Sequence, residues 1–407
     1  MKKTKLALAI TTAVFATSAM ATNGTNMTGV GAQSSAMGGT GVAAFYGAEN
    51  VIVNPAIIGK AQGTEFSFGG TLFKPSVSND GSYAAGGQTD SDADTFVIPS
   101  VSLASRINDN LTFGIGMYGT SGMGVDYSKA TGATQSGLMQ AQSNLQIMHF
   151  VPTLAYNEAN FGLGISPIIQ YGSLDINYRM DPGTGTQTYG TGMASDLGFG
   201  MSLGGYFDIN KDLTIAASYT SAISMKYDGQ LSTASAPFVT FGMLPQAFSD
   251  TLEQPAELKA GIAYNMNNIT LTGDFKQIRW SEAKGYKDFN WQDQNVIALG
   301  AKYTGNGYWV GLGYNKADNP IKEMGAAETG GLATNMFNNL FFPATTEQHY
   351  SIGGGYNLTK NVALDAAIVI APEVETSVVV SDMMGGTTTN TTKHSQQAYT
   401  VSVRYNF

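Results

Sequence analysis

The sequence predicts an all-β fold: a fourteen-stranded antiparallel transmembrane β-barrel with an N-terminal plug inside its lumen. Three observations support this fold: alternating apolar and polar residues, short turns that alternate with long loops, and an aromatic C-terminus. One face of the last strand carries Tyr399, Val401, Val403, Tyr405 and Phe407. Since successive side chains point to opposite faces of a strand, this face would meet lipid and the polar face would line a lumen.

Residues 1–21 have the pattern of a secretory signal peptide. Three lysines near the start precede an apolar stretch over residues 6–14, and Ala19-Met20-Ala21 matches a cleavage site. The alternative is an anchor helix, but the apolar stretch is well short of the roughly 20 residues that a membrane-spanning helix needs. We therefore expect export and a mature chain that begins at Thr22.

The composition argues against several classes of protein. Hydrophobic residues make up 43% of the chain and charged residues only 13%, which does not suit a disordered protein. The absence of cysteine excludes a disulfide scaffold and a thiolate metal site. A net charge of −9 without a basic stripe argues against a nucleic-acid partner. No motif indicates a metal, a nucleotide or another cofactor.

Alternating strand-like stretches occupy residues 61–407, the predicted barrel. They lie near residues 64–75, 95–107, 111–119, 143–156, 160–179, 196–209, 212–228, 255–265, 268–280, 295–304, 307–315, 347–357, 361–375 and 396–407. Every second connection is short and contains Asn, Asp or Gly, which accept hairpin turns. The others are long, such as residues 120–142, 229–254 and 376–395. Short periplasmic turns and long extracellular loops are typical of an outer-membrane barrel of a Gram-negative bacterium, and a soluble sandwich has no reason to separate them.

Residues 22–60 differ from the rest of the chain because they are rich in Gly and Ala and lack strand alternation. About eight strands already enclose an interior that side chains can fill, so a fourteen-stranded barrel would hold a water-filled lumen. We therefore predict that residues 22–60 form the plug. Asn54, Pro55 and Ala56 are expected to fix its path, since proline restricts φ and asparagine favours turns.

Several short motifs follow one another in a fixed order. They are Asn54-Pro55-Ala56, Gln254-Pro255-Ala256-Glu257-Leu258 before Gly261, Thr272-Gly273-Asp274-Phe275 before Trp280-Ser281, and Phe342-Pro343-Ala344 before His349-Tyr350-Ser351. With the plug and the barrel, this set resembles the FadL/TodX (OMPP1-type) family of outer-membrane transporters for hydrophobic compounds, across essentially the whole mature chain.

The resemblance implies passive uptake by a monomer embedded in outer-membrane lipid and lipopolysaccharide. The hydrophobic ligand would be captured at extracellular loops, enter the barrel, and leave past the plug, sideways through a kinked third strand. Substrates are long-chain fatty acids in some members of the family and aromatic hydrocarbons in others. The sequence favours fatty acids slightly and leaves the aromatic alternative open.

The loop at residues 229–254 is more apolar than a solvated loop needs to be. It carries Phe238, Phe241, Met243, Leu244 and Phe248. Exposed apolar patches usually mark binding sites, so we expect a capture groove here, completed by Met123 and Leu138 of the 120–142 loop. The alternative is that the loops merely pack on one another.

A fatty-acid carboxylate would need a cation inside the barrel, where an unpaired charge is costly. Strand alternation places Lys259, Lys302 and Arg404 inward. Further candidates are Arg179, Lys276 and Arg279. The alternative is that these cations pair with acids of the lumen or the plug, such as Glu257, Asp274, Asp365 and Glu49.

Glycines follow the third predicted strand at Gly119, Gly122 and Gly124. Glycine weakens a strand and permits a bulge, so the family's lateral gate would lie here, with an ordinary flexible loop as the alternative. Trp280, Trp291 and Trp309 are expected to be interfacial anchors.

Two other functions receive less support. A hydrolase would need a base beside its nucleophile, and His149, His349 and His394 lie in no recognisable motif, so we do not expect an enzyme. A general porin would need an open lumen, and the predicted plug argues against one.

Overall fold

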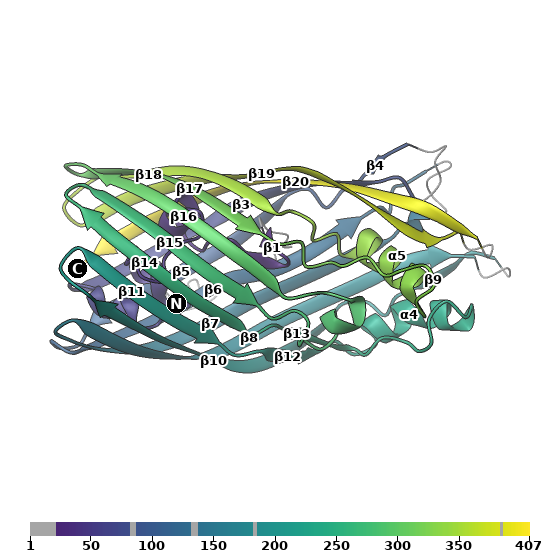
Figure 1. Cartoon of the computed structure of the whole chain (residues 1–407), viewed down its shortest axis with the longest axis horizontal. Helices are drawn as coiled ribbons and strands as arrows, with labels where there is room; N and C mark the ends of the chain where they lie inside the picture. The colour runs from purple at the N-terminus through teal and green to yellow at the C-terminus, as the bar shows by residue number, and fades with distance from the viewer. Residues whose placement is uncertain (1–21, 82–86, 132–136, 182–184, 383–385) are drawn as a thin grey trace, which may run out of the picture.

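The computed structural model describes residues 22–81, 87–131, 137–181, 185–382 and 386–407, and the predicted signal peptide lies outside them. Fourteen long strands form a closed antiparallel barrel, as the sequence predicts (Figure 1). They are β3 (Thr64–Asn79), β5 (Phe96–Arg106), β6 (Leu111–Asp126), β7 (Gln142–Glu158), β8 (Phe161–Met180), β10 (Ala194–Asp208), β11 (Leu213–Thr220), β14 (Glu257–Met266), β15 (Ile269–Ile278), β16 (Gln294–Thr304), β17 (Tyr308–Ala317), β18 (Gln348–Asn357), β19 (Val362–Ser381) and β20 (Thr387–Asn406). Each wall strand pairs with the next, and β20 pairs with β3 from Thr392↔Asn79 to Asn406↔Glu65, which closes the cylinder.

The remaining elements lie in the lumen or in the connections. They are β1 (Thr22–Asn23), β2 (Asn26–Met27), α2 (Ala32–Ala36), η1 (Ala48–Ile52), η2 (Ile57–Lys60), β4 (Thr89–Asp90), β9 (Gln187–Tyr189), β12 (Ile223–Lys226), α4 (Gln230–Thr240), β13 (Thr251–Gln254), η3 (Tyr286–Phe289) and α5 (Gly331–Phe341). Among the described residues, the helices are all too short or too polar to cross a membrane. The helices α4 and α5 lie at the end opposite the short turns, which we call the extracellular end (Figure 1).

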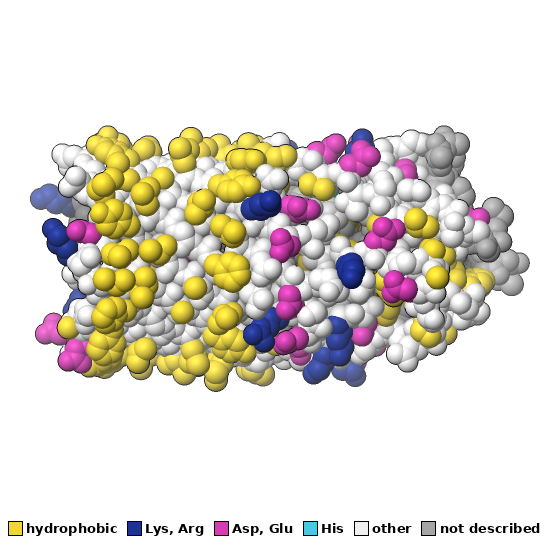
Figure 2. Space-filling view, viewed as in Figure 1, with side chains coloured by type: hydrophobic (Ala, Val, Ile, Leu, Met, Phe, Trp, Pro, Cys, Tyr) yellow, Lys and Arg dark blue, Asp and Glu magenta, His cyan; other side chains and the backbone are white. Residues whose placement is uncertain are grey.

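The outer surface of the barrel carries a broad apolar belt. On β20, Tyr399, Val401 and Val403 are exposed, whereas Thr400 and Ser402 between them are buried in the lumen. Figure 2 shows such apolar side chains gathered toward the end with the short turns, followed by a band of charged side chains. This distribution is that of a barrel whose belt lies in lipid.

Three strand boundaries differ from the prediction. The predicted loop at 376–395 is largely strand, because β19 continues to Ser381 and β20 begins at Thr387, so this hairpin extends beyond the apolar belt. The predicted strand over 212–228 divides into β11 and β12, and β12 leaves the wall to pair with β13. The strand β6 is longer than predicted and contains Gly119, Gly122 and Gly124, because pairing with β7 continues through them.

Residues 22–60, hereafter the N-terminal segment, lie inside the barrel (Figure 1). Every one of these residues is buried or half-buried. The segment approaches the wall so closely that a Cβ on Gly38 would lie 2.6 Å from the carbonyl oxygen of Tyr314 on β17. Gly38 also has a φ of 72°, which other residues rarely adopt. Glycine at this position therefore permits direct packing of backbone on backbone.

Regular pairing in the wall breaks off along β6. The pairs between β5 and β6 run from Arg106↔Thr112 to Ser100↔Tyr118 and then stop. On the other side, the register between β6 and β7 shifts between Gly119 and Ser121, which is a β-bulge. Beyond the bulge, the neighbour of β6 is β2 of the N-terminal segment, through Asn26↔Ser121. The wall thus has a gap between β5 and β6 that the segment covers from inside.

Candidate functional site

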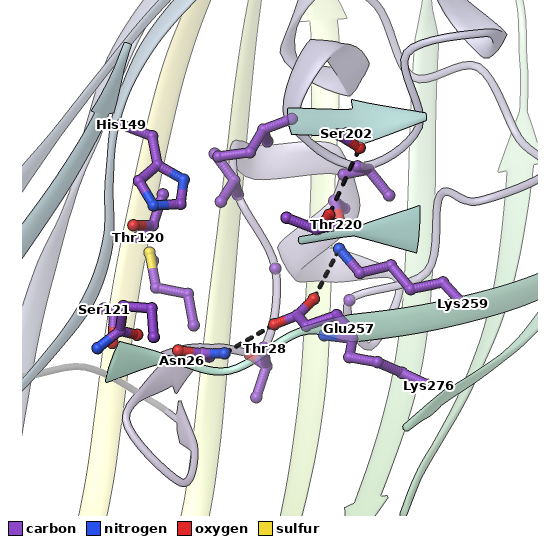
Figure 3. Close-up of a pocket in the computed structure, with 18 of the residues that line it drawn as sticks. Asn26, Thr28, Thr120, Ser121, His149, Ser202, Thr220, Glu257, Lys259 and Lys276 are labelled. Atoms are coloured by element: carbon purple, nitrogen blue, oxygen red, sulfur yellow. Dashed lines mark hydrogen bonds and ion pairs between the residues drawn. The ribbon is translucent and has the colours of Figure 1, made fainter. Parts of the chain in front are cut away.

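A cavity lies in the lumen between the N-terminal segment and the wall (Figure 3). Its lining is largely apolar and comes from both parts of the chain. The apolar members include Met27, Val42, Val51 and Val53 of the segment and Val151, Ile168, Ile223 and Val296 of the wall. The polar members include two groups on opposite sides of the cavity, which we describe in turn.

The first polar group contains four charged side chains. Glu257 on β14 forms an ion pair of 2.7 Å with Lys259 and also accepts a hydrogen bond of 2.7 Å from the amide of Asn26. Asp274 on β15 accepts hydrogen bonds from the backbone N–H groups of Gly41 and Val42, at 2.8 and 3.0 Å. The two bonds to Asp274 both reach its Oδ2, whereas its Oδ1 is buried without a partner among the described residues.

Lys276 is the cation of this group that lacks a partner. It lies on β15, lines the cavity, and has no hydrogen bond or ion pair with any residue that the structure describes. Figure 3 shows it beside Glu257 and Lys259. From the sequence alone, Lys276 is only a further candidate. The structure therefore brings Lys259 and Lys276 together at one side of the cavity.

The second polar group lies across the cavity and was missed by sequence reasoning. His149 on β7 and Gln170 on β8 are joined by a hydrogen bond of 2.8 Å between His149 Nε2 and Gln170 Oε1. Thr120, the bulged residue of β6, lies beside His149 (Figure 3). A lone inward histidine or glutamine carries no motif, so only the packing of β6, β7 and β8 identifies this group.

The strands β1 and β2 form a hairpin that lies between the cavity and the gap in the wall. The Thr25 and Ser121 hydroxyls are 2.7 Å apart, and the N–H of Gly122 donates to the carbonyl of Thr25 at 3.0 Å. On the other side of the gap, Met27 packs against an apolar patch of the lumen that includes Phe73, Phe96 and Ile98. An apolar lumen surface is unusual in a polar barrel interior and lies beside the gap.

Lys302 and Arg404 lie outside the lining of this cavity. Lys302 donates to Gln33 Oε1 at 3.3 Å and sits over the ring of Tyr46 at 5.0 Å from its centroid. Arg404 pairs with Asp365 and, at 3.5 Å, with Glu65. Arg404 thus pairs with acids of the wall, which is the alternative that the sequence left open. Lys302 instead contacts Gln33 and Tyr46 of the N-terminal segment and forms no ion pair with the described residues.

Glu49 of the N-terminal segment is buried next to these acids. Its carboxylate accepts hydrogen bonds from Ser402 at 2.8 Å and Ser67 at 3.1 Å, and it forms no ion pair with the described residues. Burial raises the pKa of Glu49 to about 7, and the nearby carboxylates of Asp365 and Glu65 raise it further, against the lowering effect of the two serines. A carboxyl group with a pKa near neutrality therefore helps to hold the segment against the wall.

Asn54, Pro55 and Ala56 pack against glycines of the wall. The amide of Asn54 donates to the carbonyl of Val42 at 2.8 Å, and its oxygen accepts from the N–H of Ala56 at 3.0 Å. A Cβ on Gly204 would lie 2.0 Å from Asn54 Oδ1. These contacts set the path of the segment against β10.

The apolar residues of the 229–254 loop mostly pack on other extracellular loops. Phe238 is 1% exposed and lies 6.3 Å from Tyr178, and Phe248 packs edge-on against Phe289. Leu244, Met123 and Leu138 are buried as well, and Met243 is half-buried. Phe241 is the exception, at 45% exposed. Of this set, therefore, Phe241 is the one at the extracellular surface.

The three tryptophans do not anchor the barrel at the membrane interface. Trp280 and Trp291 are fully buried and their rings lie 4.9 Å apart, beneath the extracellular helices. Trp280 also packs against Gly24 of the β1–β2 hairpin, where a Cβ would lie 2.6 Å from its ring. Trp309 is buried and donates to Asp365 at 2.7 Å. Trp309 alternates with the exposed Tyr308 and Val310 of β17, so its strand position does indicate an inward side chain. The burial of Trp280 and Trp291 depends on tertiary packing, which their loop positions do not reveal.

The chain is similar to known proteins along most of its length. A family model described as outer membrane protein transport protein (OMPP1/FadL/TodX) matches residues 7–407. The long-chain fatty acid transport protein of Escherichia coli O6:H1 is 24% identical over 380 residues, which cover 78% of this chain and 82% of that protein.

Two solved structures share the fold at low identity. The toluene transporter TodX of Pseudomonas putida is 19% identical, with a TM-score of 0.70 over 95% of this chain and 100% of that chain. A Pseudomonas aeruginosa FadL homologue is 16% identical, with a TM-score of 0.71 over 94% of this chain and 100% of that chain.

Proposed function

Because the chain belongs to the OMPP1/FadL/TodX family of outer membrane transport proteins, we propose that it takes up long-chain fatty acids passively across the outer membrane. The observation that carries this proposal is the position of Lys276, a cation without a partner among the described residues, at one side of an apolar cavity. The acyl chain gains roughly 0.8 kcal/mol for each methylene that leaves water. The carboxylate is stabilised by Lys276 and by Lys259, which Glu257 already contacts.

The N-terminal segment acts as the plug in this proposal. It fills the lumen below the cavity and is bound to the wall by Lys302, Glu49 and Asp274. A solute that enters from outside therefore reaches the cavity before it meets the periplasm. Capture begins at the extracellular surface with Phe241, where Met243 and Phe248 are also partly accessible.

Release is lateral, through the gap between β5 and β6. Three features support this route: the bulge at Thr120, the loss of pairing beyond Tyr118, and the apolar lumen patch that contains Phe73 and Phe96. Gly119, Gly122 and Gly124 reduce the number of side chains along this part of β6. The β1–β2 hairpin separates the cavity from the gap and must shift for the ligand to pass.

Uptake of aromatic hydrocarbons is the second candidate. The charged residues that line the cavity are two acids, Glu257 and Asp274, and two lysines, so their formal charges cancel. A neutral ligand would fill the apolar part of such a cavity without needing Lys276. The two candidates therefore differ in whether this lysine contributes to binding.

Mass spectrometry of lipophilic material that co-purifies with the protein, followed by calorimetric titration with oleate and with toluene, tests the proposal. We expect long-chain carboxylic acids in the extract and saturable oleate binding. Binding of toluene without binding of oleate would overturn the fatty-acid assignment and favour the second candidate.

A further inference from the structure

Gln170 is a buried polar side chain of the cavity, and only one of the two polar atoms of its amide is hydrogen-bonded within the described residues. It is 0% exposed, and its Oε1 is occupied by the hydrogen bond from His149. Its Nε2 is buried and has no partner among the residues that the structure describes. Leaving a buried donor unpaired is costly, and native proteins do so rarely. Gln170 lines the cavity, so its free amide edge is available to a molecule bound there.

Thr120 provides a second unused group at the same place. Its hydroxyl is buried without a partner among the described residues, and it lies beside His149 on the far side of the cavity from Lys259 and Lys276 (Figure 3). The amide N–H of Gln170 can only donate, whereas the hydroxyl of Thr120 can donate or accept. An alcohol oxygen meets both requirements, because it accepts from one group and donates to the other.

The wall around these two groups is apolar. Val151 follows His149 on β7 with one residue between, and Ile168 precedes Gln170 on β8 in the same way, so all four side chains share the lumen face. A plain hydrocarbon chain would contact these valine and isoleucine side chains but would leave Gln170 Nε2 and Thr120 Oγ1 unpaired. A chain that bears an oxygen at this point would satisfy them.

We propose that the cavity recognises fatty acids that carry an in-chain hydroxyl group, with Gln170 and Thr120 as the hydroxyl subsite. This inference rests on the proposed function, since the carboxylate is held across the cavity by Lys276 and Lys259. The carboxylate and the in-chain hydroxyl are thus each bound by a separate polar group, and the apolar wall between the two groups holds the acyl chain. The hydrogen bond from His149 occupies Gln170 Oε1 and leaves Nε2 for the ligand.

Calorimetric titration of the purified full-length protein in detergent tests the subsite with a matched pair of acids. The pair is oleate and ricinoleate, which differ by one in-chain hydroxyl. We expect ricinoleate to bind about tenfold more tightly than oleate, the effect of one good hydrogen bond. In a Gln170→Met variant, the preference for ricinoleate over oleate should disappear.

Gln254→Met is the matched control, because Gln254 lines the same cavity but its amide already donates to Tyr286 at 3.5 Å. This variant should keep the preference. Thr120→Val provides a second variant should Gln170→Met fail to fold, and it should weaken ricinoleate binding alone. Equal affinities for the two acids in the native protein would overturn the inference. Failure of both acids to bind would overturn the uptake proposal as well.

Discussion

The side-chain amide of Asn26 donates a hydrogen bond of 2.7 Å to the carboxylate of Glu257. Asn26 belongs to the N-terminal segment and Glu257 to wall strand β14, which is 231 residues further along the chain. Asn26 also pairs with Ser121 on β6, at the edge of the gap in the wall. One residue therefore joins the charged side of the cavity, the segment and the bulged strand β6.

Replacing Asn26 with Ala is expected to loosen the β1–β2 hairpin. The lost bond has a charged acceptor, and such bonds contribute about 1.5–3 kcal/mol, so the hairpin should leave the gap more often. We expect a higher and noisier ion conductance in planar bilayers. Asn295→Ala is the control, because Asn295 bonds Asp318 on the exposed surface. Native-like conductance in Asn26→Ala would show that the hairpin is held by other contacts.

Replacing Lys276 with Met is expected to weaken oleate binding by about tenfold or more, since a charge-assisted contact contributes at least 1.4 kcal/mol, about one order of magnitude. Toluene binding should be unaffected, because a neutral ligand has no use for the ammonium group. Lys316→Met serves as the control, since Lys316 is exposed on the outer face of β17. An unchanged oleate affinity would remove Lys276 from the binding site.

A leucine at position 122 is expected to obstruct lateral release. Gly122 lies in β6 just beyond the bulge, and its N–H already bonds Thr25, so a large side chain has to enter the gap. Uptake by whole cells should fall several-fold while oleate affinity of the purified protein stays the same. Gly273→Leu is the control, because a Cβ at Gly273 meets only the lipid-facing Ile262 and Leu299 at 3.6 Å. Normal uptake in Gly122→Leu would argue for release into the periplasm.

The packing of the N-terminal segment against the wall is expected to become less stable as pH rises. Burial lifts the pKa of Glu49 to about 7 from an ordinary value of 4.5, so the folded state prefers the protonated carboxyl. A raised pKa contributes stability that is complete below pH 4.5 and is lost as the pH rises through about 7. The shift corresponds to on the order of 3 kcal/mol. The neighbouring charges are Glu65, Asp365 and Arg404.

The chain has no cysteine, so a single Ser35→Cys substitution in α2 reports how often the segment opens. Thiol labelling, measured relative to a Glu49→Gln variant at each pH, should accelerate between pH 4.5 and 7. The ratio removes the intrinsic pH dependence of the thiol. A ratio that does not change with pH would show that Glu49 is not linked to the packing of the segment.

Two phenylalanines of the same loop are expected to behave differently. Phe241→Ser should reduce uptake at low ligand concentration without loss of stability, because this side chain is 45% exposed. Phe238→Ser should destabilise the extracellular loops by about 3–5 kcal/mol, the usual cost of removing a buried aromatic ring. Thermal unfolding and initial uptake rates distinguish the two effects. If both variants lost uptake equally and kept native stability, Phe238 would belong to the capture site.

The barrel could be predicted because its information is local. Alternation on strands such as β14 and β20, and the turn residues between every second pair, depend only on neighbours in sequence. Errors arose at the ends of strands. The hairpin of β19 and β20 was shortened, and β12 was joined to β11, because nothing in either stretch marks where the wall ends.

The site was only partly accessible to sequence reasoning. Lys259 was placed inward correctly by alternation, and it lines the cavity. Lys302 and Arg404 also point inward, but they lie at a level where the N-terminal segment and wall acids occupy them. Alternation in the sequence indicates which face of a strand a side chain lies on. It does not indicate which residues lie opposite that side chain across the lumen.

By itself, the sequence determined a closed barrel with an apolar belt and an unusual leading segment, since periodicity and turn chemistry act over a few residues. The tertiary structure decided which inward groups meet. Gln170, Thr120 and Lys276 share a cavity because strands distant in sequence curve around the same segment. The physical reason is that burial and unpaired hydrogen-bond donors are properties of a closed volume, which exists only once the wall and the segment are packed together.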